Sequence, residues 1–370
     1  MKILHLLSGG GIGGIEILCR DIAQISNEQH EFCFLYSGGP IAEEMQQDRI
    51  SAHFLYTESL PGRISSLIRL VKEKSYDIVI IHHEGTGIYL FYLILTFYFN
   101  KIKFIKYLHC SFEEKYFYQG NRFKDWLNYH VLKLSLERSD RLIAVSEFVK
   151  RTYGEEFTVR DEKCSVIYNG IRIPEDKKFS YGMLTADQPV NLLYIGRLVE
   201  VKGIRVLLKA MKRLKDMDEN FQLDILGDGP KRAEYEQLVQ KLQMGDSIRF
   251  HGQILQKEIF YDRTNIFVYP SVWQEAFGIS IVEAMAHKKL CVASHSGGIP
   301  EIISDDEDGF LFETANVDSL VQTLRKARAV CCSEKYDKMV LDARKKAMQF
   351  DIFKMVERLE ALCKMELEKK

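Results

Sequence analysis

The sequence predicts an α/β protein with two doubly wound parallel sheets, one in each half of the chain. Short apolar runs alternate with helical patterns from the first residues onward, which is typical of a parallel sheet with helices on both faces. The alternation restarts after a polar stretch at residues 173–190. A length of 370 residues also fits two domains better than one.

The expected elements follow one another in the order strand, helix, strand. The first half opens with an apolar run at 2–7 and continues with a helix from about Ile15 and another at 64–74. The second half opens with a strand at 191–196, and the chain closes with an amphipathic helix at 352–370. The other expected strands lie at 31–36, 76–83, 101–109, 221–227, 247–252, 266–270 and 289–294. Because ligands of such sheets bind beyond the carboxyl ends of the strands, we expect a binding cleft between the domains.

Composition excludes several classes of protein. The chain has 51 basic and 52 acidic residues, so nucleic acid is not an expected partner. Eight cysteines without C-x-x-C spacing indicate reduced thiols in a cytoplasmic protein. The start of the chain lacks the features of a signal peptide. The longest apolar run, residues 88–99, is shorter than the roughly 20 residues that a membrane-spanning helix needs.

The segment from Pro270 to Ala286 carries the strongest chemical signal. Glu275 follows a short apolar strand, and Glu283 falls inside an apolar-periodic helix. A helix N-terminus suits an anionic phosphate, whereas a carboxylate beside it is better placed to accept hydrogen bonds from hydroxyl groups. The pattern therefore predicts a ligand with both phosphate and polyol parts. The alternative is an amphipathic helix with two solvated glutamates.

A glycine-rich loop follows the first strand. Gly9, Gly11 and Gly14 match the dinucleotide-binding pattern G-x-G-x-x-G. That pattern also expects an acidic residue at the end of the second strand, and this strand ends in LYSGG. The missing acid argues against a nicotinamide or flavin enzyme. The loop can still bring its backbone close to a phosphate.

The motifs together resemble the retaining glycosyltransferases of family 4, which have the GT-B fold of two Rossmann-like domains facing across a cleft. The resemblance covers nearly the whole chain. The matching motifs are GGIGGIE at 10–16, IAVSEFVK at 143–150, VIYNGI at 166–171, GRLVEVKG at 196–203, GDGP at 227–230, RFHG at 249–252, PSVWQEAFGISIVEAMA at 270–286 and SGGIPEII at 296–303. By resemblance, residues 1–172 bind the acceptor, residues 173–350 bind the donor, and the helix at 351–370 packs back on the first domain.

The resemblance assigns roles to individual residues. Arg197 and Lys202 would hold the donor diphosphate, which their positions at a strand end and a helix start also allow. Glu283 would bind the ribose, and Glu275 the donor sugar. His109, at the end of a strand, would bind the sugar near the reacting carbon. The further donor-binding positions implied are Gly13, Gly14, Asn169, Gly196, Gly227, Phe277 and Gly278.

Two aspects of the site stay open. His82 and His83, at the end of the preceding strand, compete with His109 for its role. The chain also departs from the family pattern, with Lys288 and Leu290 where a glycine and a proline are usual, and with Arg172 in place of an aspartate. The residues show no ligand spacing for zinc or magnesium, and the family does not use a metal, so we expect no cofactor.

An aromatic and basic segment points to a second partner. Residues 91–129 contain fourteen aromatic residues, and residues 101–124 carry six basic against two acidic side chains. Such a mixture suits the surface of an anionic membrane, with Lys101, Lys103 and Lys106 facing the lipid. The alternative is that the rings form the core and acceptor cleft of the first domain.

The sequence therefore predicts a metal-independent glycosyltransferase of the hexosyltransferase type. It would move a sugar from a nucleotide-sugar, most simply a UDP-sugar, to a glycan or lipid-linked acceptor in bacterial capsule or exopolysaccharide biosynthesis. The expected location is the cytoplasm, with peripheral attachment to the inner face of the cell membrane if the aromatic segment binds lipid. The alternatives are a UDP-sugar epimerase of the same fold and a non-catalytic regulator that binds sugar nucleotides.

Overall fold

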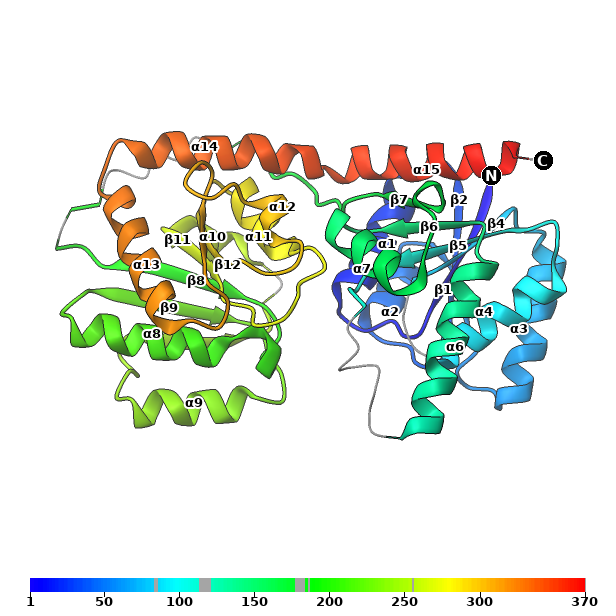
Figure 1. The fold of residues 1–370 in the computed structure, drawn as a ribbon, viewed down its shortest axis with the longest axis horizontal. Coiled ribbons are helices and arrows are strands. Elements are labelled where there is room, and N and C mark those ends of the chain that lie inside the picture. The colour runs from blue at the N-terminus through cyan, green and yellow to red at the C-terminus, as the bar shows by residue number, and fades with distance from the viewer. Residues whose placement is uncertain (83–85, 113–120, 177–183, 186, 255, 370) are drawn as a thin grey trace. The chain divides into compact units, whose positions relative to one another are not determined.

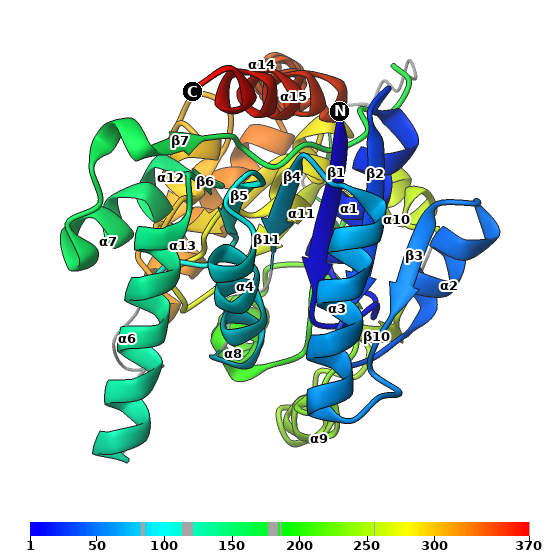
Figure 2. The ribbon, with the colours of Figure 1, turned by 90° about the vertical axis from the view of Figure 1, so that its right-hand side faces the viewer.

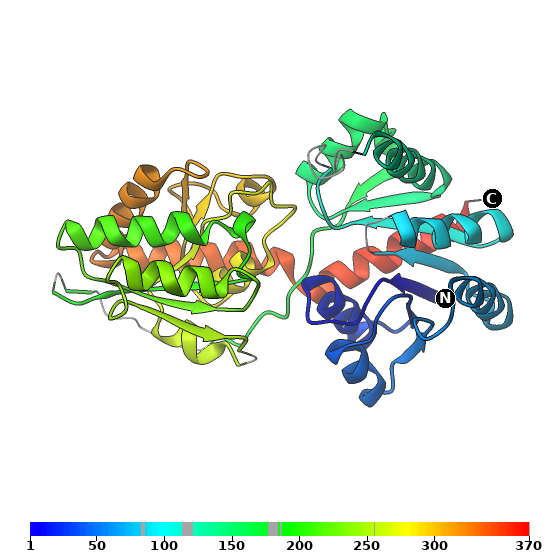
Figure 3. The same cartoon turned by 90° about the horizontal axis from the view of Figure 1, so that it is seen from below.

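The computed structural model describes residues 1–82, 86–112, 121–176, 184–185, 187–254 and 256–369. The chain forms two compact units, one of residues 1–170 with 352–370 and one of residues 171–351. Each unit is built on one parallel sheet with helices on both faces (Figures 1 and 3). The predicted fold class, two doubly wound α/β domains, is confirmed.

The sheet of the first unit has seven parallel strands in the order β3-β2-β1-β4-β5-β6-β7. The central strands are buried over almost their whole length, as expected for a parallel sheet covered on both faces. The strands are β1 (Lys2–Leu7), β2 (Gln29–Phe34), β3 (Ser51–Phe54), β4 (Ile78–Ile81), β5 (Lys103–Leu108), β6 (Arg141–Ala144) and β7 (Cys164–Val166).

Helices connect these strands, and several begin at a side-chain cap. Ser146 accepts a hydrogen bond from the N–H of Val149 at the start of α7, and Asn121 accepts one from Lys124 at the start of α6. The helices are α1 (Gly14–Ile25), α2 (Pro40–Gln47), α3 (Leu60–Lys74), α4 (Thr86–Tyr98), α6 (Arg122–Arg138), α7 (Glu147–Phe157) and α15 (Ile352–Glu368). The long apolar run lies mainly in α4. Among the described residues, no helix is long and apolar enough to cross a membrane.

The last helix, α15, belongs to the first unit and packs against α1 (Figure 2). Its buried side includes Leu359 and Cys363. Ion pairs fix its position, since Lys364 Nζ lies 2.9 Å from Glu28 Oε1. The structure thus assigns α15 to the unit on which the resemblance placed it.

The second unit has six parallel strands in the order β10-β9-β8-β11-β12-β13. The strands are β8 (Val190–Ile195), β9 (Phe221–Leu226), β10 (Ile248–Gly252), β11 (Ile266–Tyr269), β12 (Leu290–Ser294) and β13 (Phe310–Phe312). The helices are α8 (Ile204–Asp216), α9 (Arg232–Lys241), α10 (Glu258–Arg263), α11 (Ile279–Ala286), α12 (Ile299–Ile302), α13 (Val317–Cys331) and α14 (Lys335–Ala347). The strands expected from the sequence did not include β13, nor β3, β6 and β7 of the first unit.

Each sheet has a topological switch point beside its first strand. The strand order reverses between β1 and β4 in the first sheet and between β8 and β11 in the second. Ligands of such folds bind outside the carboxyl ends of the strands at that point. Several of the predicted site residues follow β1, β8 or β11, which flank these points, whereas others follow β5, β7 or β9.

Candidate functional site

In the second unit, the two residues expected to bind different parts of a donor instead contact each other. Lys202 Nζ donates to Glu275 Oε1 at 2.7 Å and to the Tyr269 hydroxyl at 2.8 Å. The Ser271 hydroxyl donates to the same carboxylate oxygen at 2.5 Å. The side chains of Lys202 and Glu275 are only 18% and 10% exposed. Burial and the adjacent Glu275 carboxylate both raise the pKa of Tyr269, so its hydroxyl stays protonated.

A close approach of two backbone segments creates this pair. Gly203, which ends the turn carrying Lys202, has φ +71°, and a Cβ there would lie 1.8 Å from the carbonyl oxygen of Pro270. The N–H of Val272 also donates to the carbonyl of Val201 at 2.9 Å. Only glycine permits this contact, so GRLVEVKG and the segment after β11 are held together.

A second glycine turn supports the Glu275 loop from the other side. The N–H of Gly298 donates to the Glu275 carbonyl at 2.7 Å, and the N–H of Gly297 donates to the side chain of Gln274 at 3.1 Å. Gly297 has φ +59°, and a Cβ there would lie 2.2 Å from the Glu275 carbonyl oxygen. The SGGIPEII motif thus fixes the backbone from which the Glu275 carboxylate projects.

Arg197 is placed differently from Lys202. Its side chain is exposed and forms no hydrogen bond or ion pair with another residue in the described part of the chain. It lies near enough to Tyr269 to lower the pKa of that hydroxyl, against the larger effect of burial. The expectation that Arg197 and Lys202 hold one anion stays a prediction; in the structure Lys202 is paired with a carboxylate and Arg197 is exposed.

Two glycines allow the backbone segments on either side of Arg197, after β8 and after β9, to approach each other closely. Gly227 has φ +129°, and a Cβ there would lie 2.0 Å from the carbonyl oxygen of Gly196. The Gly196 N–H in turn donates to the Leu226 carbonyl at 3.0 Å. Both predicted glycines therefore bring the ends of β8 and β9 together at the edge where ligands bind.

Glu283 projects from α11 and also has a lysine partner. Lys257 Nζ lies 3.0 Å from Glu283 Oε2, and the Tyr261 hydroxyl donates to the same oxygen at 3.4 Å. The carboxyl side chain remains 27% exposed. Sequence reasoning missed Lys257, which precedes α10 in a segment without a recognisable motif. Phe277 and Gly278 precede α11, where Phe277 is buried and packs edge-on against Phe350.

In the first unit, the glycine-rich loop leads directly into α1. Gly13 precedes the helix and Gly14 begins it, without a side-chain cap. The backbone N–H groups of such a helix start are available to an anion. A Cβ on Gly13 would lie 2.3 Å from Glu16 Oε2, so a carboxylate is folded close to these amides. A bound diphosphate would have to accommodate or displace that charge.

His109 and Asn169 are both buried in the first unit. His109 Nε2 is hydrogen-bonded to His82 Nδ1 at 3.1 Å, so two of the competing histidines are joined. The third, His83, lies outside the described residues. Asn169 is 6% exposed, and its Oδ1 has no hydrogen-bond partner in the described part of the chain. A buried acceptor without a partner is costly, which suits a position completed by a ligand.

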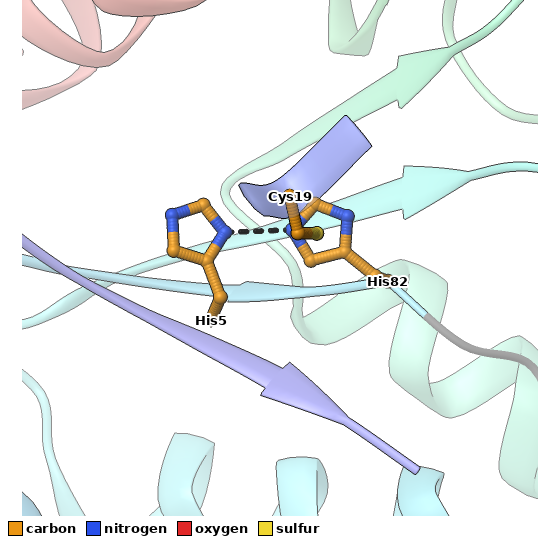
Figure 4. A group of neighbouring side chains, drawn as sticks. All are labelled: His5, Cys19 and His82. Carbon is orange, nitrogen blue, oxygen red and sulfur yellow. Dashed lines mark hydrogen bonds between the residues drawn. The ribbon is translucent and has the colours of Figure 1, made fainter. Parts of the chain in front are cut away.

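Among the described residues, one group has the composition of a metal site: His5, Cys19 and His82 (Figure 4). His5 Nδ1 and His82 Nε2 are 2.7 Å apart and share a hydrogen bond. Two nitrogens on one tetrahedral zinc ion would be about 3.3 Å apart and both without a proton. Burial raises the pKa of the Cys19 thiol well above its usual value. The group therefore fits a hydrogen-bonded pair of imidazoles better than a metal cage.

The aromatic and basic segment does not form one surface. Lys106 lies in β5, is 1% exposed, and has its ammonium 3.4 Å from the centre of the Tyr89 ring. The expectation that it faces a membrane is wrong, because its strand is central in the sheet. Lys103 is half-buried, with Nζ 3.8 Å from Asp140 Oδ1, and Lys101 is exposed. Residues 113–120 of this segment lie outside the described residues.

The exposed part of the segment lies at the start of α6. Phe123 is 73% exposed and Trp126 54% exposed, beside exposed Leu127. Arg122 and Lys124 are exposed in the same turns. The buried rings of the segment belong instead to the core of the first unit. The segment is thus divided between core residues and an exposed turn, and contact of that turn with a membrane stays a prediction.

The departures from the family pattern are accommodated locally. Lys288 adopts the left-handed conformation with φ +57°, at the place where a glycine is usual. Its Nζ lies 2.5 Å from Asp176 Oδ1. Leu290 begins β12 and is fully buried. The turn after α11 therefore forms without the usual glycine and proline.

Comparison with known proteins relates both halves of the chain to glycosyltransferases. Residues 182–346 match the family described as glycosyl transferases group 1, and residues 12–173 match glycosyltransferase family 4. The chain is 25% identical over 327 residues to an uncharacterized glycosyltransferase of Haemophilus influenzae, covering 86% of this chain and 88% of that protein. It is 33% identical over 205 residues to the lipopolysaccharide 1,2-N-acetylglucosaminetransferase of Salmonella typhimurium, covering 51% of this chain and 53% of that protein. The chain thus spans about half the length of this relative.

The fold has close counterparts among solved structures. Anabaena Alr3699/HepE, solved in complex with UDP, matches with a TM-score of 0.83 over 99% of this chain and 100% of that chain. The sequence identity is 19%, so the likeness shows the fold. The architecture is that of the GT-B glycosyltransferases, with two Rossmann-like domains.

Proposed function

We propose that this protein is a retaining glycosyltransferase that moves a sugar from a UDP-sugar to a glycan or lipid-linked acceptor. The observation that carries the proposal is the arrangement after β11. There Glu275 and Glu283 project from a fixed loop and from α11, and each is hydrogen-bonded to a lysine. Carboxylates held in this way can accept hydrogen bonds from sugar and ribose hydroxyls without being neutralised.

The nucleotide part of the donor fits the charges of the second unit. Arg197 offers an exposed guanidinium fork, which matches a diphosphate. Anabaena Alr3699/HepE has been solved with UDP and with UDP-glucose, which supports a uridine nucleotide. Glu283 keeps a partly exposed carboxylate for the ribose, with Lys257 holding its position.

The reaction would exchange one bond to the sugar for another. The bond between C1 and the diphosphate oxygen breaks, a bond from the acceptor oxygen to C1 forms on the same face, and the acceptor proton passes to the departing diphosphate. Arg197 and Lys202 would stabilise the charge that develops on the diphosphate. In this proposal no metal ion takes part, and a surface polysaccharide is the product class that the Salmonella relative supports.

Binding and turnover measurements test the proposal. UDP, GDP and ADP are titrated separately, and UDP at about 100 times its dissociation constant should stabilise the protein by roughly 2.7 kcal/mol. UDP-sugars are then offered with candidate acceptors, with and without EDTA. Loss of transfer on chelation, restored by magnesium or manganese, would exclude the metal-free mechanism. If none of UDP, GDP and ADP binds, a nucleotide-sugar is excluded as the donor.

The same assay separates the alternatives. A UDP-sugar epimerase would turn over UDP-glucose in the absence of any acceptor, whereas a transferase gives at most slow hydrolysis. A regulator would bind UDP without either reaction.

We also propose that the start of α6 binds an anionic membrane. The supporting observation is the exposed set of Phe123, Trp126 and Leu127 beside Arg122 and Lys124. Aromatic rings at headgroup level and cations near anionic lipid each favour such contact.

Trp126 itself provides the readout of membrane binding. In a Trp273→Phe background, its emission should shift to the blue with vesicles that contain phosphatidylserine, and the shift should reverse as salt rises. Arg122→Glu with Lys124→Glu should abolish the shift, whereas the control Lys101→Glu should leave it. An unchanged emission spectrum at low salt would exclude this surface.

A further inference from the structure

Four histidines form a continuous hydrogen-bonded chain across the first sheet. His30 Nδ1 meets His5 Nε2 at 2.7 Å, and His5 Nδ1 meets His82 Nε2 at 2.7 Å. His82 Nδ1 then meets His109 Nε2 at 3.1 Å. All four side chains are at least nine-tenths buried. The histidine chain therefore links β2, β1 and the ends of β4 and β5 by direct hydrogen bonds.

The strand register explains how residues so distant in sequence come together. Paired residues in neighbouring strands share a face, and so do residues two apart in one strand. Ile3, two residues before His5, pairs with His30. Ile80, two residues before His82, pairs with His5. Each step to the next strand thus moves two residues toward the carboxyl end, and one further step through β5 leads to His109.

At the His30 end of the histidine chain, the direction of the hydrogen bonds is fixed by Ser26 and Glu360. The Ser26 hydroxyl donates its only proton to Glu360 Oε1 at 2.5 Å, because an ionised carboxylate can only accept. The Ser26 oxygen also accepts the backbone N–H of Glu28 at 3.0 Å. His30 Nε2 lies 2.8 Å from the same oxygen and must donate to it. His30 therefore carries its proton on Nε2.

The donor nitrogen of His30 determines which nitrogen donates in each following imidazole. Burial lowers the pKa of His30 to about 4 and that of His5 well below its usual value, so both rings are neutral at pH 7. A neutral imidazole has one N–H and one bare nitrogen. His30 Nδ1 is then bare and accepts from His5 Nε2, and His5 Nδ1 accepts from His82 Nε2. With His82 neutral as well, His82 Nδ1 is bare and accepts from His109 Nε2.

We propose that Glu360 and Ser26, acting through this chain, hold His109 as the Nε2–H tautomer with Nδ1 as a hydrogen-bond acceptor. Glu360, Ser26, His30, His5 and His82 are positioning residues, because they act on a ligand only through His109. Any group that meets His109 Nδ1 must then be a donor. On the proposed function, on which this part of the inference rests, a hydroxyl of the sugar is such a donor.

The parent protein alone tests the tautomer. Long-range ¹H–¹⁵N spectra of the full-length, ¹⁵N-labelled protein at pH 7.5 distinguish the two neutral forms of each imidazole. Couplings across the N–H···N hydrogen bonds connect His30, His5, His82 and His109 in order. We expect all four rings in the Nε2–H form. An Nδ1–H tautomer at His109, or no coupling between the rings, would overturn the inference.

Glu360→Gln tests the origin of the direction. An amide can donate to Ser26 as well as accept from it, so His109 should become a mixture of tautomers or reverse. Glu357→Gln, one turn earlier on α15 and exposed, is the matched control and should change nothing. In a His5→Phe background, Glu360→Gln should no longer affect His109. A spectrum of His109 that is unchanged by Glu360→Gln would contradict the inference.

A kinetic measurement connects the chain to the proposed function. With UDP-glucose as the probe, Glu360→Gln should lower the rate of donor hydrolysis about 5- to 100-fold, the range for one lost buried hydrogen bond. UDP affinity should stay the same, because the nucleotide contacts proposed for Arg197 and Glu283 do not involve His109. If UDP does not bind the parent, the proposed function fails, whereas the tautomer measurements still decide the inference about the chain. If hydrolysis is unaffected while the tautomer changes, the link to the sugar is wrong.

Discussion

Replacing Lys202 by alanine should destabilise the second unit, in addition to any effect on turnover. The sequence alone suggested that Lys202 has a diphosphate as its main partner, which would make the substitution almost neutral for stability. The structure instead gives it two protein partners, the Glu275 carboxylate at 2.7 Å and the Tyr269 hydroxyl at 2.8 Å. Without Lys202, the Glu275 carboxylate would lose its cation and keep only hydrogen bonds from the neutral hydroxyls of Ser271 and Tyr269 among those described for its side chain.

The expected cost follows from the burial of the pair. Removing one partner of a buried ion pair costs about 3–5 kcal/mol, because the other charge is left without compensation. The Lys202 side chain is 18% exposed and that of Glu275 10%, so water can solvate part of the remaining charge. We therefore expect a loss of roughly 2–3 kcal/mol in the free energy of unfolding. Arg197→Ala is the control, with an expected change within about 0.5 kcal/mol, because Arg197 is exposed.

The two tryptophans allow each unit to be followed separately. The chain has two, Trp126 in α6 and Trp273 in the loop after β11. In a Trp126→Phe background, urea unfolding monitored by fluorescence reports on the second unit through Trp273. If Lys202→Ala lowers the unfolding free energy no more than Arg197→Ala does, then the pair is not formed in solution and the reasoning fails.

Three further predictions test other parts of the molecule. Glu283→Ala should weaken UDP binding by about 1–3 kcal/mol in calorimetry, through loss of the partly buried carboxylate that accepts from the ribose, and Lys257→Ala should weaken it less; equal UDP affinity in the parent and in Glu283→Ala would exclude the ribose contact. Gly297→Ala should destabilise the second unit by about 1–3 kcal/mol, since its φ is +59° and a Cβ would lie 2.2 Å from the Glu275 carbonyl oxygen. The control Gly245→Ala should be neutral, because a Cβ there would have no neighbour within 4 Å. Similar urea midpoints for the two variants would count against the predicted strain at Gly297. Burial lowers the pKa of His30 to about 4, below the unfolded value of about 6.5. The stability that neutral His30 contributes is therefore present above pH 6.5 and is lost as pH falls toward 4, by roughly 2 kcal/mol at pH 5. An unfolding free energy of the first unit that does not change between pH 7.5 and 5 would contradict this prediction.

The sequence could predict the fold because its local signals agree with one another. Short apolar runs between helical patterns have few solutions other than a parallel sheet with helices on both faces. The positions of Gly203, Gly227 and Gly297 were also visible as motifs, and in each the structure has a positive φ. At these positions the backbone needs a positive φ, which glycine adopts without steric cost. The glycine in the sequence therefore already indicates the backbone conformation.

Partners across the sheet could not be predicted in this way. Nothing in the sequence near Glu275 shows that Lys202 will face it, because the contact depends on the switch point between β8 and β11. The same holds for Lys257 and Glu283, and for Lys106, whose burial follows from the central place of β5.

The histidine chain shows most clearly which features the sequence determines and which only the tertiary structure decides. The sequence by itself determined that histidines stand in or at the ends of strands, and that a glutamate lies on an amphipathic final helix. Only the tertiary structure decided that His30, His5, His82 and His109 share one face and touch in order, because strand order and register are set by packing of the whole sheet. The return of α15 then brought Glu360 to Ser26, and a carboxylate far away in sequence fixed the direction of every hydrogen bond between them.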